Sequence, residues 1–143
     1  MRVAIIGGTG FVGRHLVDAL LDSGARPVLL ARDPAAVPEA QQAVCDIVVG
    51  DANDPESLTG LLGDCDAAIF NIGILREFPR RGVTFEALQH RAAVAAVDTA
   101  ERVGVRRFLL MSANGVDSES TAYQRTKRRA ERHLESSGLD WTI

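Results

Sequence analysis

The sequence predicts a doubly wound α/β domain, in which helices cover both faces of a parallel sheet. Short apolar runs rich in β-branched residues alternate with longer amphipathic stretches along the chain, which is typical of repeated strand–helix–strand units. The chain has 143 residues, of which 46% are apolar and 24% charged. This composition is that of one globular domain that can bury a core without disulfides or metal. We therefore expect a single domain over residues 1–143.

Strands are expected where the apolar runs are short. These runs lie at 3–6, 27–31, 47–49, 67–71 and 107–111. A sixth strand begins at Trp141-Thr142-Ile143. Because helical stretches separate the runs, the strands should be parallel neighbours joined by crossover helices.

Four helices are expected between these strands, at 11–23, 55–62, 84–103 and 120–137. Gly24, Gly104 and Gly138 follow three of them as terminators, and Asp54 precedes the second as its N-cap. The third helix is rich in alanine, so it can lie close against the sheet. The fourth is strongly charged on one side.

Composition and charge exclude several classes of protein. No apolar run approaches the roughly 20 residues of a membrane span, and the opening run is too short for a signal peptide. We expect a cytoplasmic protein without membrane insertion. The net charge of −3 argues against nucleic-acid binding. Cys45 and Cys65 form no C-x-x-C pair and the histidines are not clustered, so no metal site is expected.

A glycine-rich turn follows the first strand directly and leads into a helix. It reads Gly7-Gly8-Thr9-Gly10-Phe11-Val12-Gly13, with glycines recurring at a spacing of three. Glycine lets the chain turn sharply and lets backbone amides approach a pyrophosphate, while the helix N-terminus offers unpaired N–H groups to the anion. The turn predicts a dinucleotide site, and the alternative is a turn that serves only tight helix packing.

The ends of the second and third strands indicate which dinucleotide is bound. Arg32 follows the second strand and can pair with a 2′-phosphate, which favours NADP(H) over NAD(H). Asp33 leaves NAD open as the second choice, because it can accept from ribose hydroxyls, although aspartate before proline more often caps a helix. Asp51 and Ala52 end the third strand. Asp51 can meet an adenine amino group or merely stabilise a turn.

Tyr123 and Lys127 lie four residues apart on the fourth expected helix, so their side chains share one face. They are the only tyrosine and the only lysine of the chain. A nearby ammonium stabilises a tyrosinate, so the pair can make tyrosine a general acid or base. Ser112, at the end of the fifth strand, can polarise a substrate carbonyl beside the phenol. The alternative is an ordinary surface helix.

With these motifs the chain resembles the short-chain dehydrogenase/reductases. It is most similar to their extended and atypical branch, which includes NmrA-like regulators and proteins similar to a subunit of respiratory complex I. The resemblance covers the whole chain. It depends on GGTGFVG at 7–13, GDAND at 50–54, FNIGILRE at 70–77, GVRRFLLMSANGV at 104–116, and the Tyr123-x-x-x-Lys127 pair followed by SGLDWTI.

The resemblance implies a Rossmann sheet of order 3-2-1-4-5-6 with NAD(P) across its carboxyl edge. It also implies a role for each motif residue. Tyr123 would be the proton donor, Lys127 would hold the nicotinamide ribose, and Ser112 would orient the substrate. Gln89 falls near the position where many members carry an asparagine of the proton relay. The expected cofactor contacts are Gly7, Thr9, Gly10, Phe11, Val12 and Gly13 at the pyrophosphate, Arg32 at the adenosine end, Asp51 and Ala52 at adenine, and Asn71 and Gly73 along the ribose and the middle of the cofactor.

Two functions remain open from the sequence. The first is an oxidoreductase that acts on an unidentified small-molecule substrate, or an enzyme with related epimerase or dehydratase chemistry. The second is a non-catalytic NADP(H)-binding sensor or an assembly protein. Family members usually continue with a substrate-binding portion, which residues 1–143 are expected to lack. A homodimer through 84–103 and 120–137 is also expected as a family trait. The arginines within 75–83 can clamp an acidic substrate or be ordinary loop charges.

Overall fold

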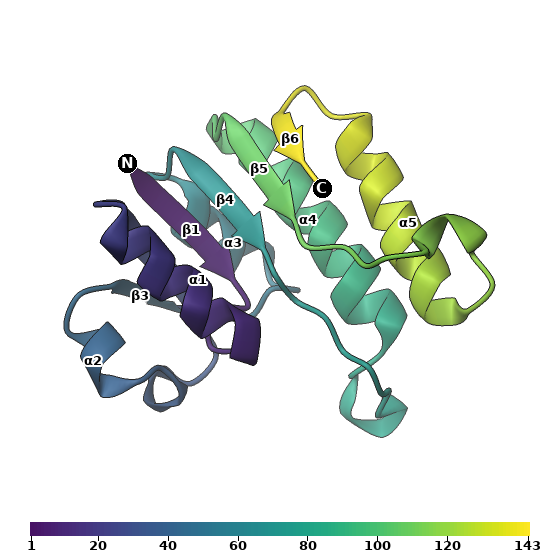
Figure 1. Ribbon diagram of the computed structural model, residues 1–143, viewed down its shortest axis with the longest axis horizontal. Helices are drawn as coiled ribbons and strands as arrows, with labels where there is room; N and C mark the ends of the chain where they lie inside the picture. Colours follow the sequence, from purple (N-terminus) through teal and green to yellow (C-terminus); the bar gives the residue numbers. More distant parts are fainter.

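The computed structural model describes residues 1–143 as a six-stranded sheet with helices on both faces (Figure 1). The strand order is β3-β2-β1-β4-β5-β6, and every neighbouring pair is parallel. This confirms the predicted Rossmann arrangement. The strands are Arg2–Ile6 (β1), Arg26–Ala31 (β2), Asp46–Val49 (β3), Ala67–Phe70 (β4), Arg107–Leu110 (β5) and Asp140–Thr142 (β6).

The chain winds first to one side of β1 and then to the other. The reversal lies between β1 and β4, and the loops that leave their carboxyl ends therefore diverge and leave a crevice at that edge. The α-helices are Phe11–Asp22 (α1), Glu39–Gln42 (α2), Pro55–Leu62 (α3), Ala92–Val103 (α4) and Ala122–Glu135 (α5). Figure 1 shows α1 crossing one face of the sheet, with α3 and α4 behind the other.

Alternating strand residues supply the two faces of the core. Ala4 and Ile6 of β1 join a cluster of 22 buried residues that includes side chains of α3, α4 and α5. Ile5, between them, packs with Val17 of α1 on the opposite face. Alternation places successive side chains on opposite faces, and both faces of the central strands are buried. This is why these strands read as unbroken apolar runs.

The alanine-rich helix lies close to the sheet, as its sequence predicts. Ala92, Ala96 and Ala100 of α4 are completely buried. Gly104 ends the helix with φ +86°, a conformation that glycine adopts without strain. Asp54 caps α3 as expected, since its Oδ2 accepts from the Ser57 N–H at 2.9 Å.

One expectation about the elements needs correction. The expected helix over 84–103 is not α-helical throughout, because Glu86–Arg91 forms a π-helix before α4 begins. The connection between β2 and β3 holds a 3₁₀ turn at Pro34–Ala36 and the short helix α2. Further 3₁₀ turns occur at Pro79–Arg81 and Val116–Ser118. No helix has both the length and the apolar character to cross a membrane.

Candidate functional site

The glycine turn packs so tightly that side chains are excluded at two positions. Gly7 has φ +96°, and a Cβ there would lie 2.9 Å from the carbonyl carbon of Asn71. A Cβ on Gly13 would lie 2.2 Å from the Gly7 carbonyl oxygen. The first turn of α1 is thereby held against the end of β1. No side chain caps this helix at Gly10, so its first N–H groups point outward and can bind an anion.

The other residues of the turn border open space. Thr9 lines a cavity of about 420 Å³ at the carboxyl edge of the sheet. Phe11 and Val12, in the first turn of α1, are 84% and 44% exposed. The structure therefore places the predicted pyrophosphate contacts around one accessible helix N-terminus.

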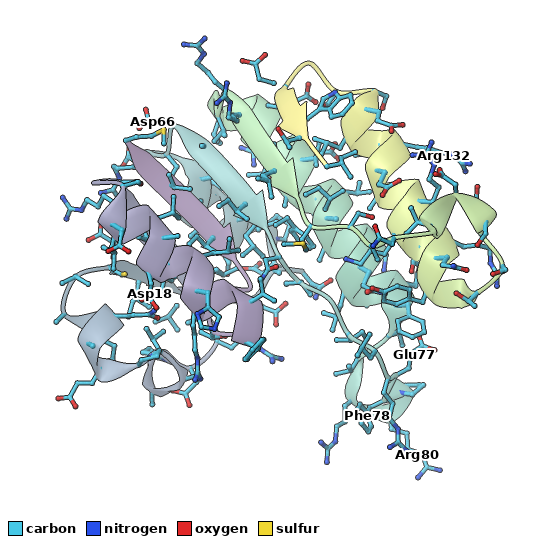
Figure 2. The ribbon with its side chains drawn as sticks, viewed as in Figure 1. Asp18, Asp66, Glu77, Phe78, Arg80 and Arg132 are labelled. Atoms are coloured by element: carbon cyan, nitrogen blue, oxygen red, sulfur yellow. The ribbon has the colours of Figure 1, made fainter.

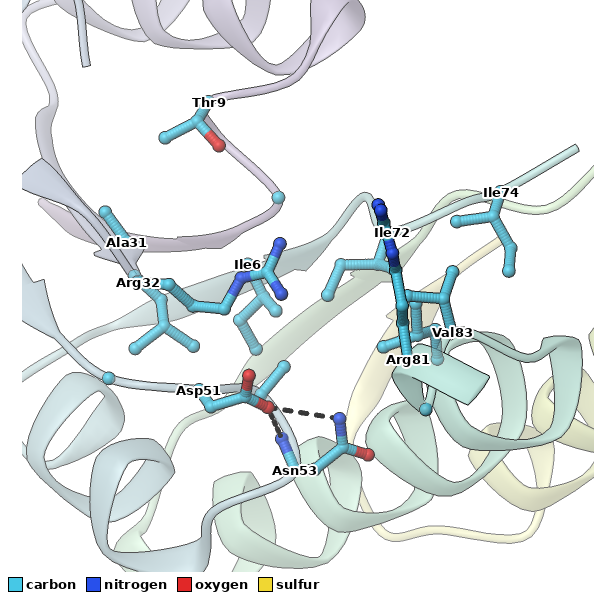
Figure 3. A pocket seen from close by; sticks show the side chains of 16 residues that line it. Ile6, Thr9, Ala31, Arg32, Asp51, Asn53, Ile72, Ile74, Arg81 and Val83 are labelled. Carbon is cyan, nitrogen blue, oxygen red and sulfur yellow. Dashed lines mark hydrogen bonds between the residues drawn. The ribbon is translucent and has the colours of Figure 1, made fainter. Parts of the chain in front are cut away.

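The cavity gathers residues from the ends of four strands (Figure 3). Gly7 follows β1, Arg32 follows β2, Asp51 and Ala52 follow β3, and Ile72 follows β4. These segments are far apart in the sequence and meet because parallel strands end at the same edge. The predicted adenosine contacts are thus brought together.

Two aspartates near this cavity are engaged in local turns. Asp33 caps the 3₁₀ turn, because its Oδ1 accepts from the Ala35 N–H at 2.9 Å. Asp51 Oδ1 accepts from the backbone N–H of Asn53 at 2.8 Å and from its Nδ2 at 3.1 Å. Asp51 therefore stabilises a turn while it also lines the cavity. Arg32 lines the cavity without an ion-pair partner.

Lys127 is buried, with 5% of its surface exposed. Its Nζ donates to the Met111 carbonyl oxygen at 2.7 Å, immediately before Ser112. Burial lowers the pKa of the Lys127 ammonium from its ordinary value, and the charge of Glu131 opposes that shift. A Cβ built on Gly73 would lie 3.7 Å from Nζ. Gly73 therefore lies next to the ammonium.

Gln89 and Ser112 carry buried polar atoms that have no hydrogen-bond partner. Both amide atoms of Gln89 and the Oγ of Ser112 are in this state. Gln89 is 1% exposed, and its Oε1 lies 3.9 Å from the Cβ position of Gly73, close to Lys127. Buried polar groups are normally paired. The unpaired Gln89 amide beside Gly73 is therefore available to a ligand or a bound water.

The π-helix brings Gln89 to this position. Thr84 starts the segment, since its Oγ1 accepts from the Ala87 N–H at 3.1 Å. The wide turn over Glu86–Arg91 then joins α4 without a break. Such turns are frequent at functional sites.

Tyr123 lies one helical turn before Lys127 and is half-buried. Its ring packs edge to face against Phe85, with centroids 5.7 Å apart. A capping box between Thr121 and Gln124 fixes the start of α5. Tyr123 and Lys127 thus share a face of α5 as predicted. The cavity at the carboxyl edge of the sheet is lined by neither of them nor by Ser112.

The sequence left the roles of two residues at the site open. Arg81 lines the cavity, whereas the sequence allowed the arginines of 75–83 to be either a clamp for an acidic substrate or ordinary loop charges. Gln89 was aligned only loosely with the asparagine position. Both depend on how 71–91 folds back onto the sheet, and no local pattern carries that information.

Three comparisons with known proteins agree with this geometry. Residues 7–143 match the family described as NAD(P)H-binding. The ceramide reductase of Caulobacter vibrioides is 35% identical over 130 residues, which cover 90% of this chain and 40% of that protein. The photosystem II assembly factor Ycf39 of Synechocystis is 26% identical over 144 residues, which cover 100% of this chain and 43% of that protein. A short-chain dehydrogenase/reductase superfamily protein from Agrobacterium tumefaciens, solved with bound NAD, has a TM-score of 0.82 and 21% identity, and the match covers 100% of this chain and 48% of that one.

The chain belongs to the NAD(P)H-binding family. It spans less than half the length of the relatives named above. The residues present fit a dinucleotide. The helix start at Gly10 is uncapped, and polar atoms of Gln89 and Ser112 are buried without partners.

Proposed function

We propose that this chain is the cofactor-binding and proton-transfer part of an NAD(P)(H)-dependent oxidoreductase of the short-chain dehydrogenase/reductase type. The substrate class is a small carbonyl compound or the corresponding alcohol. Related epimerase or dehydratase chemistry would use the same cofactor site and the same Tyr123 and Lys127 pair. The observation that carries the proposal is the buried Lys127. Its ammonium reaches the backbone beside Ser112 from the helix that also holds Tyr123. A buried ammonium is costly, so a structural role alone is a poor reason for it.

The proposed cofactor contacts follow the cavity. Backbone N–H groups over 10–13 bind the pyrophosphate, with Gly7 and Thr9 beside it, and Asn71 and Gly73 border the ribose and the middle of the cofactor. At the adenosine end, Asp51 and Ala52 meet adenine. Arg32 follows β2 as a free cation, which supports NADP(H) over NAD(H), because a 2′-phosphate is a strong partner for guanidinium.

The proton transfer is assigned to the chain's own side chains. When bound, the nicotinamide supplies or accepts a hydride at its C4. In the reducing direction Tyr123 gives its phenolic proton to the carbonyl oxygen, so that a carbonyl, a hydride and a proton become an alcohol. Ser112 donates a hydrogen bond to the same oxygen. Lys127 stabilises the phenolate by its charge and offers N–H donors to ribose hydroxyls, with Gln89 beside it.

Ceramide reductase, the relative with the highest identity reported above, supports reductase chemistry by its name. Its length also matters, since this chain covers 40% of it. We therefore include in the proposal that the substrate wall comes from outside residues 1–143. A homodimer through the segments around α4 and α5 is part of the same family-based proposal.

The first test is a titration of the purified protein with NADPH and NADH, followed by nicotinamide fluorescence. We expect both to bind and NADPH to bind more tightly. Failure of both nucleotides to bind would overturn the proposal.

The second test measures turnover of a panel of carbonyl compounds by the wild type and by Tyr123→Phe. We expect the variant to lose about 10²-fold or more in kcat while its nucleotide affinity stays unchanged. A rate that survives the substitution would contradict the assignment of Tyr123.

A second candidate function is a nucleotide-binding assembly protein without turnover. Similarity to the assembly factor Ycf39 along the whole chain favours it. In that case NADPH or NADH binds, no carbonyl compound is reduced, and Tyr123→Phe has no effect on any readout. Retention of both Tyr123 and Lys127 argues for the enzyme, because a sensor needs no proton donor.

A further inference from the structure

The loop between β4 and the π-helix folds into a closed turn that projects from the body of the protein. Phe78 and Val83 pair through two backbone hydrogen bonds, of 2.7 Å and 3.3 Å. Glu77 secures the base of the turn, since its Oε1 accepts from the Phe85 N–H at 2.7 Å. Between these ties lies the 3₁₀ turn Pro79–Arg81. The turn is therefore held in one shape by its own bonds.

Two adjacent arginines of this turn face different surroundings. Arg81 lines the cavity at the carboxyl edge of the sheet. Figure 3 shows its side chain across the cavity from that of Arg32. Arg80 does not line the cavity, and Figure 2 shows it at the tip of the projecting loop. One turn thus aims one arginine inward and its neighbour outward.

Neither Arg32 nor Arg81 has a carboxylate within 4.0 Å. By contrast, Arg2 and Arg26 both pair with Asp46, at 2.7 Å and 3.0 Å. The only acidic residue that lines the cavity is Asp51, whose Oδ1 already accepts two hydrogen bonds from Asn53. Two unpaired cations on opposite walls leave the cavity with a net positive charge.

We propose that Arg81 is a specificity residue that clamps the adenosine 2′-phosphate of NADP(H) together with Arg32. The inference rests on the proposed function and adds a second residue, besides Arg32, that binds the 2′-phosphate. A guanidinium binds a phosphate through two parallel N–H···O bonds, and two of them from opposite walls match the charge of a phosphate dianion. NAD(H) has a hydroxyl at this position, which would leave both guanidinium groups unpaired.

The position of the cavity favours this phosphate over an acidic substrate. Its walls include the ends of β1, β2 and β3, where the adenosine part of the cofactor is proposed to bind. Tyr123, Lys127 and Ser112 do not line it. A substrate held by Arg81 in this cavity would lie away from the proposed proton donor, whereas an adenosine phosphate would not need to reach it.

The test compares Arg81→Gln with the matched control Arg80→Gln. NADPH, NADH and 2′,5′-ADP are titrated into both variants and the wild type, by fluorescence for the reduced nucleotides and by calorimetry for 2′,5′-ADP. For Arg81→Gln we expect at least about tenfold weaker binding of NADPH and of 2′,5′-ADP, and less than about twofold change for NADH. Arg80→Gln should bind all three ligands as the wild type does. Thermal unfolding of both variants checks that the turn has not collapsed.

The outcomes separate the inference from the proposed function. A wild type that binds none of the three ligands overturns both. A wild type that binds NADPH while Arg81→Gln binds it equally well overturns only the role of Arg81. Equal weakening of NADPH and NADH also overturns it, because Arg81 would then hold a part that both nucleotides share. Loss of discrimination between NADPH and NADH in the double variant Arg32→Gln/Arg81→Gln would support the clamp.

Discussion

Two buried glutamines show how the two halves of this sheet differ. Gln41 lies in the connection between β2 and β3 and is 6% exposed, and Gln89 lies before α4 and is 1% exposed. Gln41 donates from Nε2 to the Arg14 carbonyl oxygen at 3.1 Å and to Asp18 Oδ1 at 2.8 Å. Gln41 leaves only its Oε1 without a partner, whereas Gln89 makes no hydrogen bond through either amide atom. The first glutamine holds structure together, whereas the second is available to something else.

The same contrast extends to the surroundings of each glutamine. In the half formed by β1, β2 and β3, the carboxylates of Asp33, Asp46 and Asp51 accept hydrogen bonds from the chain itself. In the half formed by β4, β5 and β6, Ser112 is also buried without a partner, and Lys127 is buried as a cation. The nucleotide half leaves only Arg2 Nε and Gln41 Oε1 unpaired. The reaction half leaves the whole Gln89 amide and Ser112 Oγ unpaired beside a buried cation, a stability cost that a bound ligand would offset.

The largest effect is expected at the glycine turn. In Gly13→Val the new Cβ would meet the Gly7 carbonyl oxygen at 2.2 Å, so α1 must move away from β1. We expect a loss of stability of about 1–3 kcal/mol or more and a loss of nucleotide binding, measured by urea unfolding and by NADPH titration. The control is Gly60→Ala in α3, where a Cβ meets nothing within 4 Å and should stabilise by about 0.5–1 kcal/mol. Unchanged NADPH binding by Gly13→Val would show that the turn does not form the site.

A large effect on turnover and on the pH dependence of stability is expected for Lys127→Met. Burial lowers the pKa of Lys127 in the folded chain. At pH values between this pKa and the higher pKa of Lys127 in the unfolded chain, the unfolded chain therefore binds more protons than the folded chain. The stability of the wild type therefore rises with pH through that window, and Met lacks this rise. Turnover should fall about 10²-fold or more. At neutral pH, removal of the buried charge raises the free energy of unfolding, and loss of the hydrogen bond to Met111 lowers it by about 1 kcal/mol.

Urea unfolding across alkaline pH measures this difference. Arg125→Met, which removes an exposed cation from the same helix, is the matched control and should run parallel to the wild type. Parallel profiles for Lys127→Met and the wild type would contradict the burial of a charged Lys127.

The sequence predicts the nucleotide half better than the reaction half. The glycine turn, the cap at Asp54 and the strand runs are local patterns, since each depends on residues a few positions apart. They were predicted and are present in the structure. The alternative role of Asp33 as a helix cap was also weighed from the sequence, and the bond from the Ala35 N–H to its Oδ1 confirms it.

The π-helix and the inward direction of Arg81 could not be predicted. A π-turn has no distinctive residue pattern, and periodicity alone made 84–103 look like one regular helix. The direction of Arg81 depends on the Phe78 and Val83 pairing, which sets the orientation of the whole loop. Both features follow from tertiary contacts of the 71–91 segment, and these contacts are not encoded by local spacing.

Substitution of the two buried glutamines, Gln89 and Gln41, should change stability by an intermediate amount and provides a matched comparison. Gln89→Leu removes a buried amide without partners, so we expect a gain in stability of about 1 kcal/mol or more. Gln41→Leu removes two hydrogen bonds and leaves Asp18 and the Arg14 carbonyl without that partner, so we expect a loss of about 1–3 kcal/mol. Urea unfolding measures both. Turnover of Gln89→Leu should fall about tenfold if the amide assists Lys127. A loss of stability in Gln89→Leu would mean that the amide is a structural group after all.

The smallest effect is expected at Asp46, which ties β3 to β1 and β2 through Arg2 and Arg26. The hydrogen bond from Arg26 is the main reason why its pKa is lowered. The stabilisation is therefore present above the ordinary carboxyl pKa and is lost as pH falls through the lower, folded value. Because the pair is exposed, Asp46→Asn should cost only about 0–1 kcal/mol at pH 7. The cost should shrink in acid and in high salt, whereas Asp22→Asn, which removes no ion pair, should cost nothing. An equal cost for Asp46→Asn at all pH values would assign the effect to packing.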